Sequence, residues 1–172
     1  MGALVPEVRW YEGKKPCMLS QFIDSVDLKQ YLKDKSIPDA KKEFTKTLLR
    51  RHFVLDCLLA NWDVIGLEAD NVRVDKQGFP WRIDNGSGLN RRAQGDLKPA
   101  QFWGTTVLDL SSMRDAAINP STAVFFESIS NEEIQEQIDE LLTHQSVILD
   151  ATPDEFKELI KQRLFYLPTY SS

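Results

Sequence analysis

A short segment with the pattern of a β-hairpin, set between helix-forming segments, most constrains how this chain can fold. Val72–Val74 and Pro80–Ile83 have the residue types of paired strands, and the turn residues Asp75-Lys76-Gln77-Gly78 separate them. A hairpin returns the chain to its starting point. The residues that flank it, Asn71 and Asp84, must therefore lie close together.

Helical patterns flank this hairpin on both sides. Residues 40–60 have helical spacing, with Phe44, Leu48 and Leu58 among the apolar positions. Ser130–Glu133 is a capping box that predicts a helix with Ile134 and Ile138 on one face. Thr152–Glu155 reads as a second capping box with Pro153 at the first helical position, and it predicts the last helix.

The first third of the chain adds smaller elements. Val8–Tyr11 and Cys17–Ile23 are predicted to form a second β-hairpin, and a short helix is expected over Leu28–Leu32. Residues 89–104 show no clean period, and the tail 168–172 is expected to be loose. The prediction is a single α+β domain, mostly α, with short β-hairpins.

Composition excludes several classes of protein. Hydrophobic residues make up 42% and charged residues 27% of the 172 residues, which is typical of a globular domain. A net charge of -5 offers no overall attraction to nucleic acid, and no apolar run is long enough for a membrane span. The two cysteines make neither a disulfide framework nor a zinc site, and no secretory signal is visible, so a cytoplasmic location is expected. A secreted effector without a classical signal is the alternative.

Oxygen-bearing side chains gather around the open end of the central hairpin. Magnesium takes hard oxygen ligands, typically one or two protein groups together with phosphate oxygens. Asn71 and Asp84 could share such a cation, and Asp63 on the preceding loop could face the same point as a base. The competing interpretation is that Asp, Asn and Gly here are ordinary turn residues.

These residues resemble a known superfamily. The order of Asp63, Asn71 and Asp84-Asn85-Gly86 is similar to the catalytic loop and metal-binding loop of protein-kinase-like enzymes. The likeness is to the atypical branch that contains HipA-like and phosphatidylinositol kinases, where a strand ends in Ile-Asp-Phe-Gly. Bacterial members carry segments similar to 61–66, 70–71, 82–86 and 92–95 of this sequence.

The resemblance implies a fold and a set of roles. Residues 27–167 would form a kinase-like large lobe, and residues 1–26 would be the remnant of a largely missing small lobe and its hinge. ATP and Mg²⁺ would be the cofactors, with Asp63 as the catalytic base and Asn71 and Asp84 as metal ligands. Backbone groups from Phe22 through Ile23 and Asp24 to Ser25 would meet the adenine. Arg91 and Arg92 would contact phosphate or an acidic substrate, or else lie in a solvated activation segment.

The sequence departs from the family pattern in two ways. Asp63 and Asn71 stand farther apart than in the usual kinase loop, so Asp70 is a rival for the role of base. In addition, no glycine-rich loop and no clear small-lobe lysine are visible, because Lys14 and Lys15 lie in a hairpin turn. Phosphoryl transfer depends on those groups for positioning and charge neutralisation.

Two functions follow as hypotheses. One is an ATP- and Mg-dependent phosphotransferase, or its large-lobe portion. The other is a catalytically inactive, pseudokinase-like interaction module that binds a protein partner. The expected partners are a nucleotide, a protein or second chain that supplies the small lobe, and another copy of this chain through an uncovered apolar face.

Overall fold

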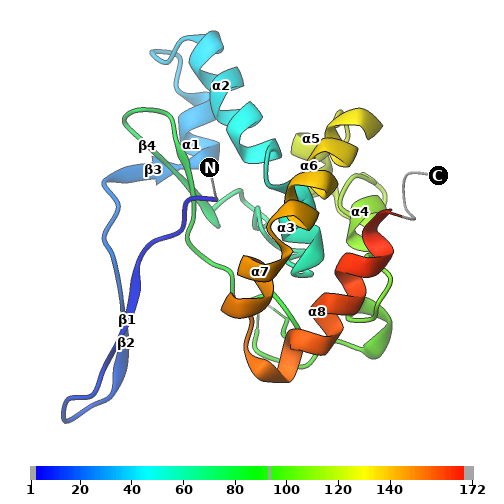
Figure 1. Cartoon of the computed structure of the whole chain (residues 1–172). Coiled ribbons are helices and arrows are strands. Elements are labelled where there is room, and N and C mark those ends of the chain that lie inside the picture. Colours follow the sequence, from blue (N-terminus) through cyan, green and yellow to red (C-terminus); the bar gives the residue numbers. More distant parts are fainter. Residues whose placement is uncertain (1–2, 93, 169–172) are drawn as a thin grey trace.

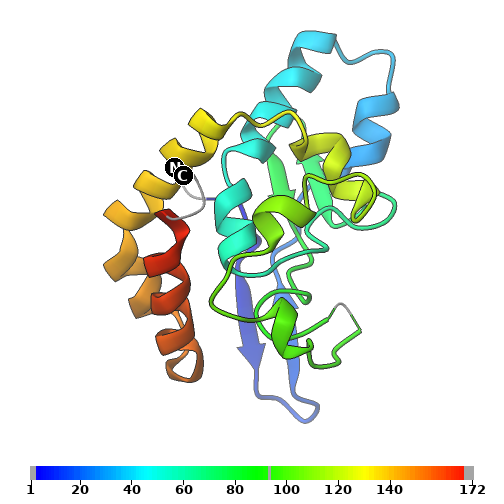
Figure 2. The same cartoon turned by 90° about the vertical axis from the view of Figure 1, so that its right-hand side faces the viewer.

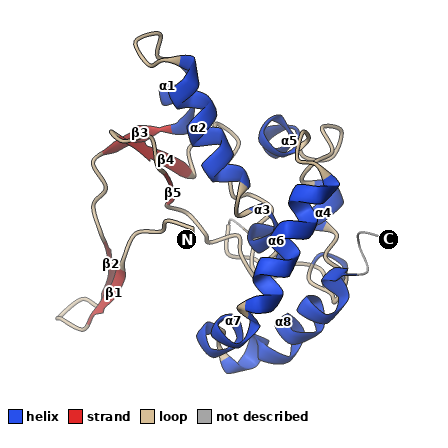
Figure 3. Cartoon of the chain, turned by 45° about the horizontal axis from the view of Figure 1, so that its top comes forward, coloured by secondary structure: helices blue, strands red, loops and turns tan. Residues whose placement is uncertain are grey.

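The computed structural model describes residues 3–92 and 94–168 as an α+β fold in which helices predominate. The strands gather on one side of the molecule and helices α3–α8 lie on the other (Figure 3). The strands are β1 (Val8–Tyr11), β2 (Cys17–Ser20), β3 (Ser25–Asp27), β4 (Val72–Asp75) and β5 (Pro80–Arg82). The α-helices are α1 (Leu28–Lys33), α2 (Asp39–Arg50), α3 (Phe53–Leu58), α4 (Asp109–Ser112), α5 (Pro120–Phe126), α6 (Asn131–Thr143), α7 (Gln145–Ala151) and α8 (Asp154–Tyr166).

The central hairpin is confirmed as the middle and edge of an antiparallel sheet with the order β3-β4-β5. Val72 pairs with Arg82, and Val72 and Val74 point into the core because alternate side chains of a strand share one face. The Asp75 carboxylate closes the turn by accepting from the backbone N–H groups of Gln77 and Phe79, at 3.0 and 2.9 Å.

Helix α3 is the centre of the helical side. It contacts α4, α6 and α8, and five of its residues are buried. The Phe53 ring lies 5.0 Å from the Phe126 ring, centroid to centroid. The only charged residue of α3, Asp56, is buried and paired with the guanidinium of Arg82 on β5 at 2.6 Å. Figures 1 and 2 show α6 and α8 lying alongside α3.

The single helix predicted over residues 40–60 is wrong: the chain forms α2 and α3 with a break at Arg51 and His52. A continuous helix would join the N–H of Val54 to the carbonyl of Arg50. Instead the side chain of Gln137, on α6, occupies this position. Its amide oxygen accepts from Val54 N at 3.1 Å and its amide nitrogen donates to Arg50 O at 3.1 Å. An inserted side chain of this kind is a known cause of helix breaks.

The two capping-box predictions have different outcomes. Ser130 is confirmed, because it and Glu133 exchange reciprocal side-chain and backbone hydrogen bonds at the start of α6. Thr152 is wrong: its hydroxyl donates to Ile148 O at the end of α7, and α8 begins after Pro153 without a side-chain cap. Pro153 is therefore the N-cap residue and not the first helical one.

The remaining differences concern short elements. The second predicted strand ends at Ser20, and the unpredicted β3 pairs with β4 instead. Among the described residues of 89–104, which leave out residue 93, the chain is irregular as expected except for one 3₁₀ turn, η1 (Ala100–Phe102). Helices α4, α5 and α7 were not predicted. The expected loose tail lies outside the described residues apart from Pro168. In the described part of the chain, no helix combines the length and apolarity needed to cross a membrane.

Candidate functional site

The segment that follows α3 is held by hydrogen bonds to its backbone carbonyls. Every carbonyl from Cys57 to Asp63 accepts at least one. The donors are backbone N–H groups and the side chains of Asn71, Lys98, Asn119 and Arg163. Ala60 adopts a positive φ of 52°, which turns the chain sharply out of the helix. The loop that carries Asp63 is therefore fixed in place from several directions.

Arg163 of α8 is the most deeply buried of these donors. Its guanidinium donates to the carbonyls of Leu58 and Cys57, both at 2.8 Å, and to Gly104 O at 2.6 Å. The same group lies 4.9 Å from the centroid of the Trp103 ring. Since a helix ends in unsatisfied carbonyls, Arg163 acts as a side-chain cap for α3.

Lys98 joins two loops to each other. Its ammonium donates to Ala60 O, Ser87 O and Leu89 O, which belong to the two loops that flank the sheet. Burial lowers the pKa of Lys98 to about 8. The group is still protonated at neutral pH, and an ammonium has three donors for its three acceptors.

A partly buried side-chain network connects the same two loops. Asn61 donates from Nδ2 to Asn85 Oδ1 at 3.0 Å, and Ser87 Oγ donates to Asn61 Oδ1 at 2.8 Å. Asn61 and Ser87 are 3% and 5% exposed, so the bond between them is shielded from water, whereas Asn85 is exposed. The backbone N–H of Leu89 also donates to Leu59 O.

Asn71 and Asp84 flank the hairpin, as the sequence predicts. The N–H of Ile83 donates to Asn71 O at 3.0 Å, so the backbone at Asn71 is paired with the residue before Asp84. The side chain of Asn71 donates from Nδ2 to the backbone carbonyl of Asp63 at 2.7 Å. Because its nitrogen is engaged, the amide oxygen of Asn71 is the atom that can act as a ligand.

The three aspartates of this region lie within electrostatic range of one another. Burial raises the pKa of the half-buried Asp63, and the negative charges of Asp70 and Asp84 raise it further. The structure therefore groups Asp63, Asp70 and Asp84 with Asn71. A bound cation would offset this repulsion and lower the pKa of Asp63.

The donor set fits magnesium only in part. Among residues 3–92 and 94–168, no group of three or more Asp, Glu, His or Cys side chains is arranged to hold a metal ion. One Asp84 carboxylate and one Asn71 amide oxygen give two hard ligands, which matches the way Mg²⁺ binds when phosphate oxygens and water complete its shell. Asp84 Oδ1 also accepts from Gly86 N at 2.9 Å, which orients the carboxylate.

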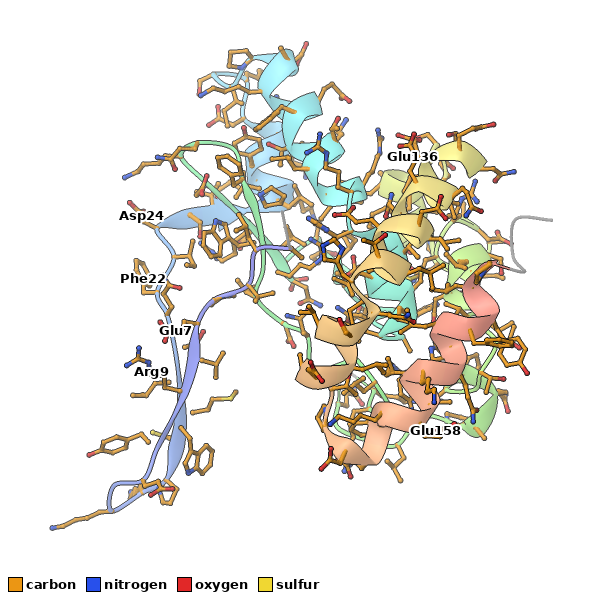
Figure 4. The ribbon with its side chains drawn as sticks, in the orientation of Figure 1. Glu7, Arg9, Phe22, Asp24, Glu136 and Glu158 are labelled. Atoms are coloured by element: carbon orange, nitrogen blue, oxygen red, sulfur yellow. The ribbon has the colours of Figure 1, made fainter. Side chains whose placement is uncertain are left out.

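The predicted adenine-facing segment is only partly available. Ser25 is part of β3, where its carbonyl accepts from the Arg73 guanidinium at 2.5 Å and its hydroxyl donates to Ile23 O. Asp24 forms an ion pair with Lys76 at 2.6 Å. Phe22 is 88% exposed and extends into solvent (Figure 4). Ser25 lies opposite Asp75, which is four residues after Asn71. At the rise of an extended strand, Ser25 is therefore displaced by about 13 Å along the strand from Asn71.

Arg91 and Arg92 lie in a small loop beyond the Asp84 segment. The Arg91 guanidinium donates to Gly95 O at 3.0 Å, and Arg92 exchanges backbone bonds with Gly95 and Asp96. Both side chains are exposed. Their described contacts are local to this loop.

A polar cleft of about 550 Å³ lies beside Asp70. It separates the loop before β4 from α1, and Lys29 of α1 forms an ion pair with Glu68 of the loop. Its lining carries charges of both signs from Asp27, Lys29, Gln30, Lys33, Asp34, Glu68 and Asp70.

The residues that hold the site together are those that sequence reasoning missed: Asn61, Lys98, Asn119 and Arg163. Asn119 caps α5 and also donates from Nδ2 to Trp62 O at 2.9 Å. Asn119-Pro120 was a readable helix-start signal. Lys98 and Arg163 gave no local signal, since their acceptors lie elsewhere in the chain.

Comparison with known proteins gives no relative: no family model, no curated protein and no solved structure matches this chain.

Proposed function

We propose that this chain is the large-lobe portion of a kinase-like phosphotransferase that binds ATP with Mg²⁺. Residues 27–167 would form the lobe and residues 1–26 its link to the small lobe. Asn71 and Asp84 would hold the metal against the nucleotide phosphates, and Asp63 would accept the proton of the attacking hydroxyl. When bound, the metal would neutralise charge on the phosphates.

The observation that supports this proposal most strongly is the bond from Asn71 Nδ2 to Asp63 O. It ties the proposed base to one metal ligand, while the backbone pairing of Asn71 with Ile83 brings the other ligand alongside. Three polar residues from two loops thus share one location on a rigid support. Loop residues positioned in this way by a fixed scaffold are typical of catalytic sites.

The small number of protein ligands leads to a specific expectation for binding. Because the protein supplies two oxygen ligands, Mg²⁺ alone should bind weakly, and nucleotide and metal should bind together. Calorimetry with ATP, with MgCl₂ and with both tests this on the full chain. Asp84→Ala should weaken binding of the complex at least tenfold, whereas Asp150→Ala, an exposed aspartate on α7, should leave it unchanged.

Lack of any binding at millimolar ATP with Mg²⁺ would refute the proposal for the chain acting alone. If binding is present, Asp63→Asn and Asp70→Asn distinguish the two candidate bases. The variant at the true base should retain Mg–ATP binding and lose phosphate transfer to water or to the chain itself. The other variant should keep both.

The second candidate function is an interaction module without phosphotransferase activity. The observation in its favour is that Lys14 and Lys15, the lysines nearest to a small-lobe position, lie exposed at the tip of the β1–β2 hairpin. This function predicts that Asp63→Ala folds normally and keeps its protein partner. Absence of Mg–ATP binding together with a retained partner would favour it.

A further inference from the structure

The β1–β2 hairpin forms an arm, residues 5–22, that projects away from the rest of the molecule (Figures 1 and 4). Its two strands pair only with each other in the described structure, since the other sheet contains β3, β4 and β5. All residues of both strands are exposed. A two-stranded hairpin alone is at best marginally stable in water, so an arm of this kind needs a surface to cover it.

The arm has one face that is predominantly apolar. Trp10 lies opposite Met18, and Val8 lies opposite Ser20, so these side chains share a face of the hairpin. Val8, Trp10 and Met18 are 51%, 63% and 67% exposed. The other face carries Arg9, Tyr11, Cys17 and Leu19 and is more mixed. We define the first set, Val8, Trp10 and Met18, as the apolar face of the arm.

The arm exposes apolar side chains on both of its faces. An aromatic side chain presents roughly 150–250 Å², so Trp10, Tyr11 and Phe22 together leave about 400 Å² in water at their observed exposures. Val5, Val8, Met18 and Leu19 are also at least half exposed. The largest apolar patch of a typical monomer is about 300–600 Å² in total. Only Trp10 of these aromatic residues lies on the apolar face, so that face with Val8 and Met18 supplies less than half of the ~800 Å² that each partner contributes to a standard interface.

Charge favours a second copy of the same chain as the covering surface. The arm carries Arg9, Lys14 and Lys15 against Glu7 and Glu12, a net charge of +1, and the whole chain carries -5. The remainder of the molecule therefore carries -6. In a two-fold arrangement with antiparallel arms, the lysines at each tip approach the acidic body of the other copy.

We propose that two copies of this chain associate through their arms, with the apolar face of each arm packed against that of the other. The arrangement buries the same patch on both copies, as a closed two-fold dimer requires. Trp10 would be its main contributor, because Trp is enriched among the residues that dominate interface energetics. This inference does not depend on the proposed phosphotransferase function.

Sedimentation equilibrium of the full chain over a concentration series tests the proposal. The native chain should be a monomer–dimer equilibrium. The double variant Trp10→Ser/Met18→Ser should raise the dimer dissociation constant by about 30-fold or more. Phe165→Ser is a matched control, because Phe165 is a 74% exposed aromatic residue on α8. It should leave the dimer unchanged.

The arm also contains its own probe site. Cys17 is exposed and Cys57 is buried, so a thiol-reactive spin label attaches to Cys17 alone. This residue is on the mixed face and leaves the apolar face free. In the dimer the labels should give one defined dipolar distance, which disappears in the double variant.

Three results would overturn the proposal. The first is a native chain that is monomeric at every concentration. The arm would then be a contact surface for a different protein. The second is a dimer that survives the double variant, and the third is a dimer lost equally in the Phe165 control. Circular dichroism of the double variant should match the native chain, since the replaced side chains do not belong to the buried core.

Discussion

Replacing Arg163 by Met should destabilise the fold by about 4 kcal/mol. Arg163 is fully buried, and Leu58 O and Gly104 O both accept from its guanidinium. A methionine fills similar space but has no donor, so the buried carbonyl of Leu58 and the partly buried carbonyl of Gly104 lose their partner at about 1–3 kcal/mol each. Loss of the contact with the Trp103 ring adds about 0.5–1 kcal/mol.

The desolvation of the buried Arg163 charge acts in the opposite direction. Removing a buried charge relieves its desolvation, and apolar replacements of buried ion pairs are sometimes neutral or stabilising. Here the partner Asp109 lies 3.7 Å away and burial raises its pKa to about 6, so it can take up a proton when the cation is gone. The acceptors that matter are backbone carbonyls, which cannot be neutralised. We therefore expect the loss of hydrogen bonds to exceed the gain.

Urea unfolding followed by circular dichroism measures this difference. A loss of about 4 kcal/mol corresponds to a melting temperature lower by about 10 °C for a domain of this size. The stability of Arg163→Lys should lie between those of the native chain and Arg163→Met, because lysine keeps the positive charge but has only one nitrogen to donate. Arg91→Met, at an exposed arginine, should change stability by less than about 0.5 kcal/mol. An Arg163→Met chain within 1 kcal/mol of native stability would refute this account of the α3 end.

Two further predictions concern pH and helix capping. Burial lowers the pKa of His52 to about 4. Between pH 4 and 6.5 this histidine therefore binds more protons in the unfolded state than in the native state, and its contribution to native stability rises with pH. Asp109, with its pKa raised to about 6, contributes the opposite slope between pH 4 and 6, so His52→Gln should shift the slope of stability against pH toward negative values relative to the native chain; an unchanged slope would contradict this. Ser130→Ala removes the capping box of α6 and should cost about 1 kcal/mol, seen as a melting temperature lower by about 2–4 °C, whereas an unchanged melting temperature would show that the cap contributes nothing.

Local chemistry made parts of this fold predictable. The central hairpin follows from its turn residues and strand types, and with it the closeness of Asn71 and Ile83. The capping box at Ser130 is likewise set within four residues. The proximity of the two proposed ligands therefore needed no tertiary information.

Other parts depend on residues that are distant in sequence. The break between α2 and α3 depends on Gln137, which is 83 residues from Val54. The end of α3 depends on Arg163, which is 105 residues from Leu58. Periodicity alone predicted one long helix because the apolar spacing continues through the break. Thr152 has the residue type of a cap, but its hydroxyl donates to the carbonyl of Ile148 in the preceding helix instead.

The bonds that join residues 59–61 to residues 85–89 have a consequence for motion. Lys98, the Asn61–Asn85–Ser87 network and the Leu89–Leu59 bond connect the two loops at several separate points. Neither loop can move without breaking most of these bonds together, so the pair should open as one cooperative unit in hydrogen exchange. Any closure around a ligand would then fall to the segment 66–70, whose exposed Leu67, Glu68 and Asp70 lie outside these bonds.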